Sequence, residues 1–222
     1  MALQPLAERL RPQSLDDYIG QKHLVGENGV FRKFIATGSV PSFILWGPPG
    51  VGKTTLAKII ANTLDRPFYT LSAVTSGVKE VREVIDKAKN QHLFNARPAF
   101  LFIDEIHRFN KSQQDSLLGA VEQGIITLIG ATTENPSFEV ISPLLSRCQV
   151  YTLKPMQDED LQQLLNRALS TDEELKRRNI KVEESAALFR FAGGDARKLL
   201  NILDIITSSR EGDLVITDDL VT

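Results

Sequence analysis

Residues Gly47 to Thr54 read GPPGVGKT, the spacing G-x-x-x-x-G-K-[ST] of a loop that wraps around phosphate groups. The apolar run Phe43–Trp46 comes directly before this stretch. The segment Lys53–Leu64 that follows carries apolar residues at helical spacing. A strand, this loop and a helix in that order form the context in which the spacing is specific. The sequence therefore predicts a phosphate-binding loop between a strand and a helix.

The residue types of the loop suit a nucleoside triphosphate held together with Mg²⁺. Glycines allow consecutive backbone N–H groups to turn toward phosphates, and the helix start adds the positive end of its dipole. Lys53 would place its charge on the β- and γ-phosphates, and the Thr54 hydroxyl would ligate Mg²⁺. The residues expected to bind the nucleotide here are Gly47, Pro48, Pro49, Gly50, Val51, Gly52, Lys53, Thr54 and Thr55.

Outward from the loop, apolar runs alternate with amphipathic segments. The apolar residues between Val30 and Ile35 indicate an early helix, which Gly38 can cap. Ser112 and Asp115 have the spacing of a capping box. Strands are expected over 43–46, 67–71, 99–103, 125–131 and 148–153, and helices over 53–64, 78–88 and 112–121. Strands that alternate with helices predict an α/β fold, a parallel sheet flanked by helices.

The pattern changes at Lys154-Pro155, after which no long apolar run follows. Three amphipathic helices are expected, around 161–168, 187–191 and 199–206. We therefore expect two domains, an α/β core over 1–153 that includes an extended N-terminal arm (3–17), and a small all-helical domain over 154–222. The final segment Asp218–Leu220 has the composition of a helix start, so the sequence is expected to be truncated.

Two adjacent carboxylates follow the apolar run 100–103, at Asp104 and Glu105. If this strand neighbours the strand before the phosphate loop, its carboxyl end lies beside the phosphates. Asp104 would then hold the Mg²⁺ shell. Glu105 would orient and polarise the attacking water.

Composition excludes several other classes of protein. Apolar residues make up 42% of the 222 residues and charged residues 24%, and the net charge of −2 does not by itself suggest nucleic acid. One cysteine, Cys148, supports neither a disulfide framework nor a zinc site. No apolar run approaches the about 20 residues of a membrane span, and the first residues lack a signal region. A cytoplasmic protein with no membrane partner is expected.

Beyond these patterns, the chain resembles the AAA+ ATPases of the clamp-loader clade. The triplet Ser-Arg-Cys at 146–148 has the form found in clamp-loader subunits. The strings LSAVTSGVK at 71–79, HRFNK at 107–111 and GATTENPSF at 130–138 closely resemble the replication-associated recombination protein A family. Members of that family are related to the Werner-helicase-interacting ATPase. The resemblance covers essentially the whole chain and implies an AAA+ core, a lid domain, and hydrolysis of ATP with Mg²⁺.

The resemblance also implies roles for residues outside the phosphate loop. Thr132 or Thr133 would be sensor 1, which reads the γ-phosphate, and Asn135 competes for this role. Arg147 would be the arginine finger that reaches the γ-phosphate of a neighbouring subunit, since a fork of donors neutralises charge in the transition state. Arg197 would be sensor 2, in the first turn of a lid helix. Positions beside adenine would be Arg11, Pro12, Tyr18 and Ile19.

The family's partner is DNA. The implied function is a DNA-dependent ATPase of replication, recombination and stalled-fork maintenance that acts at single-strand gaps, duplex ends or forks. The resemblance also implies a homo-oligomer, single-strand-binding protein or replisome components as binding partners, and association with the nucleoid. The basic helix face with Lys79, Arg82, Lys87 and Lys89 is either a solvated surface or a contact for the DNA backbone.

Three rival functions share parts of these motifs. A sliding-clamp loader subunit and a Holliday-junction branch-migration motor have the same core motifs. The single cysteine argues against the bacterial clamp-loader motor subunits, which usually carry zinc-binding cysteines after the phosphate loop. A nucleotide-gated scaffold with little hydrolysis belongs to another class, and the presence of Lys53 and Glu105 argues against it.

Overall fold

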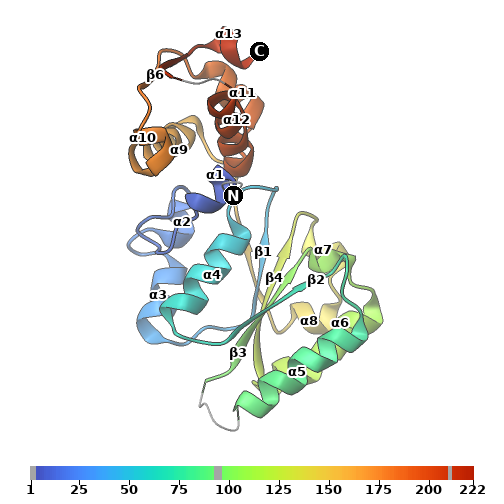
Figure 1. Cartoon of the computed structure of the whole chain (residues 1–222). Coiled ribbons are helices and arrows are strands. Elements are labelled where there is room, and N and C mark those ends of the chain that lie inside the picture. The colour runs from blue at the N-terminus through green and yellow to red at the C-terminus, as the bar shows by residue number, and fades with distance from the viewer. Residues whose placement is uncertain (1–3, 93–96, 210–211) are drawn as a thin grey trace. The chain divides into compact units, whose positions relative to one another are not determined.

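The computed structural model describes residues 4–92, 97–209 and 212–222, which form two units (Figure 1). The larger unit comprises Lys22–Pro48 and Lys53–Leu153. The second unit contains the described residues up to Gln21, the short segment Pro49–Gly52, and Lys154–Thr222. The chain thus changes unit at residue 154, where the sequence pattern changes. The N-terminal arm, which was expected with the core, belongs to the second unit.

A five-stranded, fully parallel sheet forms the centre of the larger unit, in the order β2-β3-β4-β1-β5. Strands β3 and β4 are buried along almost their whole length, which agrees with their continuous apolar runs. Strand β5 lies at the edge and is largely exposed. The strands are β1 (Phe43–Trp46), β2 (Phe68–Ser72), β3 (Ala99–Asp104), β4 (Ile126–Thr132) and β5 (Gln149–Thr152).

Helices cover both faces of this sheet, as the alternating pattern predicted (Figure 1). Helices α5 and α6 pack against each other on one face, and α3 and α4 lie on the other (Figure 1). As predicted, α3 ends at Gly38, whose φ of 68° is left-handed. The helices of this unit are α2 (Lys22–Val25), α3 (Val30–Thr37), α4 (Lys53–Thr63), α5 (Val78–His92), the 3₁₀ turn η1 (Ile106–Arg108), α6 (Lys111–Glu122), α7 (Pro136–Glu139) and α8 (Ser142–Leu145).

The start of α6 corrects one detail of the sequence analysis. The capping box is formed by Asn110 and Gln113, not by Ser112 and Asp115. The Asn110 side chain accepts from the Gln113 amide at 2.9 Å, and the Gln113 side chain accepts from the Asn110 amide at 2.8 Å. An Asn–Gln pair can satisfy two backbone amides at a helix start, as a Ser–Asp pair can. Residue type alone therefore does not show whether the helix begins after Asn110 or after Ser112.

The second unit is not all-helical, contrary to the expectation. Two short strands, β6 (Ile180–Val182) and β7 (Leu214–Ile216), pair in parallel beside its helices. Each strand has only three residues, too few for a periodic signal in the sequence. The helices are α1 (Leu6–Arg9), α9 (Asp158–Thr171), α10 (Glu173–Lys176), α11 (Ala186–Ala192), α12 (Ala196–Ser208) and α13 (Asp218–Val221). Among the described residues, no helix combines the length and apolar character that a membrane crossing needs.

The expected extended arm begins instead with the helical turn α1, whose apolar side is part of the second unit's core. Leu6, Leu10 and Ile19 are buried in the same cluster as residues of α9 and α12. The Arg9 guanidinium makes a two-bond ion pair with the buried Asp172 carboxylate, at 2.7 and 3.1 Å. Burial raises the pKa of Asp172, but the hydrogen bonds from Arg9 and from backbone amides outweigh it and hold this pKa below its usual value. These contacts explain why the arm belongs to this unit.

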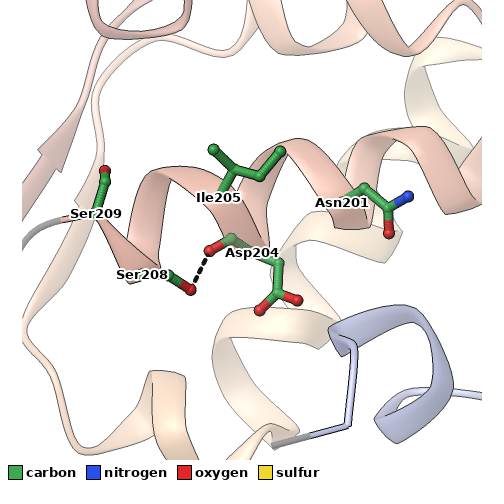
Figure 2. A pocket seen from close by; sticks show the side chains of 5 residues that line it. All are labelled: Asn201, Asp204, Ile205, Ser208 and Ser209. Atoms are coloured by element: carbon green, nitrogen blue, oxygen red, sulfur yellow. Dashed lines mark hydrogen bonds between the residues drawn. The ribbon is translucent and has the colours of Figure 1, made fainter. Parts of the chain in front are cut away.

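The arm also contacts the outer side of α12, beside a shallow hollow (Figure 2). The Asp204 carboxylate there accepts from the Leu6 amide at 3.1 Å, which satisfies a backbone donor at the start of α1. Figure 2 also shows the Ser208 hydroxyl donating to the Asp204 carbonyl, at 2.6 Å. The hollow measures about 480 Å³ and is lined by Asn201, Asp204, Ile205, Ser208 and Ser209.

A cluster of four aromatic rings holds α3 against the strand that leads into the phosphate loop. The Phe31 ring, which is fully buried, lies with its centroid 5.3 Å from that of Phe43 in β1 and 5.0 Å from that of Tyr151 in β5. Phe34 packs against the same rings. The cluster therefore joins α3 to two neighbouring strands of the sheet.

Phe31→Ala should lower the free energy of unfolding by about 3–5 kcal/mol, because it empties the centre of this cluster. Phe138→Ala is the matched control, since the Phe138 ring is 84% exposed and its loss should change stability by about 0.5 kcal/mol or less. Urea denaturation followed by circular dichroism measures both. Equal losses in the two variants would contradict the packing described here.

Candidate nucleotide-binding site

Three strands end at the same edge of the parallel sheet, and each carries residues expected in the site. β1 ends at Trp46 just before the loop, β4 ends at Thr132, and β3 ends at Asp104. The Gly47 amide donates to the Thr132 carbonyl at 3.1 Å, which fixes the loop start to β4. β4 lies between β1 and β3, so the carboxylate strand is not the direct neighbour of β1. The carboxylate strand was considered as a direct neighbour of β1 in the sequence analysis, and the sheet order corrects this.

Lys53 begins α4 and bends back into the loop that precedes it. Its ammonium donates to the carbonyls of Gly47 at 2.7 Å and Pro48 at 2.8 Å, and the residue is only 8% exposed. Thr54 and Thr55 follow in the same turn and are half-buried. A buried cation and the N–H groups of a helix start are thus gathered at one loop, a donor set that fits phosphate oxygens.

The tip of the loop, Pro49–Gly52, packs within the second unit. The Ala196 amide at the start of α12 donates to the Gly50 carbonyl at 3.2 Å, and the Tyr18 hydroxyl donates to the Val51 carbonyl at 2.9 Å. Gly50 and Gly52 have φ of 70° and 98°. A Cβ on Gly50 would lie 1.7 Å from Asp195, and one on Gly52 would lie 2.2 Å from the Tyr18 oxygen. Gly50 and Gly52 are therefore required to be glycine, both because φ is positive and because a Cβ would collide with a neighbouring side chain.

Tyr18 was expected beside adenine, and the structure shows a different contact. Its side chain is almost fully buried, and this burial raises the pKa of the hydroxyl. The hydroxyl acts as a donor to the phosphate loop itself. Tyr18 therefore supports the loop, a contact that the sequence could not indicate.

Asp104 and Glu105 stand at the end of β3 and are half-buried. Glu105 has φ 53° and ψ 48°, a left-handed conformation that is uncommon outside glycine and is found at functional sites. Its Oε2 atom lies 3.2 Å from Nδ1 of His107 and accepts from the Thr133 hydroxyl at 3.3 Å. The backbone turns sharply at Glu105, where η1 begins, and this turn brings the His107 side chain close to the Glu105 carboxylate.

His107 is the residue of this site that the sequence analysis missed. The three histidines of the chain lack a metal-ligand spacing, so spacing assigns no role to His107. The signal available was its position two residues after Glu105.

The two threonines at the end of β4 differ in environment. Thr132, expected as the catalytic sensor, has no exposed surface, and its hydroxyl donates to the Glu134 carbonyl at 3.1 Å. Thr133 is half-buried and contacts Glu105. Asn135 caps α7 through the Ser137 amide, at 3.0 Å. Of the two hydroxyls, that of Thr133 is therefore the one that contacts Glu105.

Arg147 lies at the surface of the larger unit, after α8. Its guanidinium forms an ion pair with Glu122 at the end of α6 and donates to the Pro143 carbonyl at 2.5 Å. The side chain is 36% exposed. Burial raises the pKa of the adjacent Cys148 thiol to about 12, which disfavours the reactive thiolate.

The remaining candidates all belong to the second unit. The Arg11 guanidinium is paired with the Glu8 carboxylate, and Pro12 is half-buried. Ile19 is a buried core residue of this unit. Arg197 is exposed in the first turn of α12, the helix whose start contacts Gly50. Asp195 caps this helix by accepting from the Lys198 amide at 2.9 Å.

Comparisons with known proteins agree with this geometry. The chain is 48% identical over 205 residues to a replication-associated recombination protein A of Haemophilus influenzae, and 50% identical over 203 residues to the ATPase WRNIP1 of Dictyostelium discoideum. These matches cover 91% and 90% of the chain but only 46% and 23% of the relatives. The chain thus spans less than half the length of these relatives.

A solved structure also matches over most of the chain. The RuvB Holliday junction branch migration motor of Thermotoga maritima superposes with a TM-score of 0.73 at 30% sequence identity, over 96% of this chain and 70% of that one. The sequence profile of the ATPase family associated with various cellular activities matches residues 43–156, from β1 through the end of the sheet. Since this is just over half of the chain, and it contains the loop, the two carboxylates and β4, the chain belongs to the ATPase family associated with various cellular activities (AAA).

Proposed function

We propose that this chain is the ATP-hydrolysing part of a protein that acts on DNA during replication and recombination. The observation that carries the proposal is the meeting of Gly47, Thr132 and Asp104 at one edge of a parallel sheet, with Lys53 buried in the loop beside them. This arrangement supports a phosphate site next to the two carboxylates Asp104 and Glu105. The names of the relatives in H. influenzae and D. discoideum support both ATP hydrolysis and the DNA role.

The residues of the larger unit divide the work of hydrolysis. Lys53 and the amides of the loop bind the phosphates of ATP, and Thr54 and Asp104 would hold Mg²⁺, which supplies charge neutralisation. Glu105 accepts a proton from water as the water oxygen bonds to the γ-phosphorus. The bond from that phosphorus to the bridging oxygen breaks, and ADP and phosphate leave. The Thr133 hydroxyl helps to hold Glu105 in place.

Arg147 acts as the arginine finger of a neighbouring copy. Its position at the exposed surface suits contact with another subunit, and its ion pair with Glu122 keeps the guanidinium at that surface. An arginine stabilises the charge that develops on phosphoryl oxygens, so the finger should contribute on the order of 10³-fold or more to the rate. The active form is therefore a homo-oligomer, and the isolated chain hydrolyses ATP slowly.

The second unit responds to the nucleotide through the tip of the loop. Ala196 and Tyr18 bond to carbonyls of Gly50 and Val51, so a change in loop shape is passed to α12 and to the arm. Arg197 in the first turn of α12 serves as sensor 2. Arg11, Pro12 and Ile19 lie near the adenine, within the same unit as the loop tip.

DNA is the proposed effector, at single-strand gaps, duplex ends or forks. Single-strand-binding protein or other replisome components are candidate partners, and such work places the protein at the nucleoid in the cytoplasm. The likeness to RuvB favours a branch-migration motor as the second candidate. The identity of 48% to replication-associated recombination protein A exceeds the 30% to RuvB, so we rank the replication and recombination ATPase first.

Steady-state ATP hydrolysis by the chain should rise in specific activity with protein concentration and with gapped DNA. Lys53→Ala should abolish it, whereas Lys58→Ala, on the same helix, should retain it. Arg147→Ala should remove the concentration dependence. Activity at the Lys53→Ala level throughout would refute hydrolysis, and activity indifferent to DNA would refute the DNA role alone.

Gly50→Ala should weaken binding of MgATP by about tenfold or more, because the new Cβ would displace the Asp195 carboxylate that caps α12. Gly38→Ala is the matched control. Its φ of 68° carries the same backbone cost, but nothing lies within 4 Å of its added Cβ. Titration with a fluorescent ATP analogue measures both affinities, and equal weakening in the two variants would show that loop crowding is not the cause.

A further inference from the structure

His107 forms a polar cluster with Glu105 and both threonines that end β4. Its Nδ1 atom lies 3.0 Å from the Thr132 hydroxyl oxygen and 3.2 Å from Oε2 of Glu105. The imidazole side chain is only 10% exposed, and the Glu105 side chain is 33% exposed. All of these residues belong to the larger unit.

The hydrogen-bond partners determine which ring nitrogen of His107 carries a proton. A carboxylate oxygen can only accept hydrogen bonds. The Thr132 hydroxyl donates its single hydrogen to the Glu134 carbonyl and accepts from the Glu134 amide at 3.0 Å, so its oxygen also acts as an acceptor. An unprotonated Nδ1 would therefore point its lone pair at two acceptors. With the Thr132 hydrogen directed to Glu134, we infer that Nδ1 carries the hydrogen and donates it to the Thr132 oxygen at 3.0 Å, with Oε2 of Glu105 3.2 Å away.

The buried Thr132 acquires a role from this arrangement. The Thr132 hydroxyl donates to the carbonyl of Glu134 and accepts from its amide. These two hydrogen bonds fix the hydroxyl oxygen, which can accept a further hydrogen bond from the imidazole. It therefore orients the His107 ring, and the ring in turn orients Glu105. Thr132 thus acts on the site through His107 and needs no contact of its own with the nucleotide.

One oxygen of Glu105 faces two donors. Oε2 is the oxygen near Nδ1 of His107, and it also accepts from the Thr133 hydroxyl. Because contacts to Oε2 fix the orientation of the Glu105 carboxylate, the direction of Oε1 is fixed as well. The left-handed backbone at Glu105 is what brings His107 back to this side within two residues.

We propose that His107 is a positioning residue that, with Thr133, holds Oε2 of Glu105, so that Oε1 takes the proton of the attacking water. This inference rests on the proposed hydrolysis by Glu105. An Nδ1–H donor is sufficient for this task. Asparagine at position 107 can offer an amide N–H at a similar place, whereas leucine fills the space without any donor.

The kinetic test compares His107→Asn with His107→Leu in single-turnover hydrolysis, with the chain in excess over ATP. His107→Leu should slow the chemical step by on the order of tenfold or more, and His107→Asn should stay within about threefold of the parent. Affinity for a fluorescent ATP analogue should change by less than about twofold in both. An unchanged rate in His107→Leu, or equal slowing in both variants, would overturn the proposal.

A second measurement needs no turnover and separates this proposal from the proposed function. Nitrogen-edited NMR of the imidazoles, with the His107 signals assigned by their loss in His107→Asn, should show a proton on Nδ1. The tautomer protonated on Nε2 alone would overturn the proposal. If the parent chain fails to hydrolyse ATP while Nδ1 is protonated, the hydrolysis is refuted and the contact between His107 and Glu105 stands.

Discussion

The parallel direction of all five strands is the constraint on which the candidate site depends. Parallel strands end at a common edge of the sheet. This edge therefore brings together the loop after β1, the end of β4, and the carboxylates Asp104 and Glu105 at the end of β3. The hydrogen bond from Gly47 to Thr132 fixes the first of these meetings. The apolar runs of β3 and β4 are buried on both faces and set the register.

Glycine at the loop tip is the second constraint, and it concerns the second unit. Gly50 and Gly52 have left-handed backbones, and the side chains of Asp195 and Tyr18 occupy the space where a Cβ would stand. The same four-residue tip receives hydrogen bonds from the start of α12 and from the arm. The loop tip is thus contacted by both the start of α12 and the arm, within the second unit.

The sequence predicted the features that have strong local signals. The strand before the loop, the buried strands and the cap at Gly38 all follow from residue type and spacing, and the structure confirms them. It did not predict β6 and β7, whose three-residue segments are too short for periodicity, nor the register of the α6 cap. The prolines and charges of the arm indicated an extended segment. Leu6 and Leu10 instead pack into the core of the second unit, whose other residues are distant in sequence.

Contacts between side chains were the hardest part to predict. Thr132 and Thr133 are adjacent and chemically identical, and only the direction of each side chain shows which one lies beside Glu105. The role of His107 depends on a left-handed turn at a non-glycine residue, which no spacing rule indicates. Strain of this kind is typical of functional sites and appears only in three dimensions.

The central claim is that the shared edge of the sheet binds MgATP and places Glu105 against the attacking water. A crystal structure of the chain with Mg²⁺ and a non-hydrolysable ATP analogue tests it most directly. The account predicts that the phosphates lie against Gly47–Thr54, that Thr54 and Asp104 hold the metal, and that Oε1 of Glu105 bonds to a water in line with the γ-phosphate. Phosphates bound elsewhere, or Glu105 turned away from that water, would contradict it.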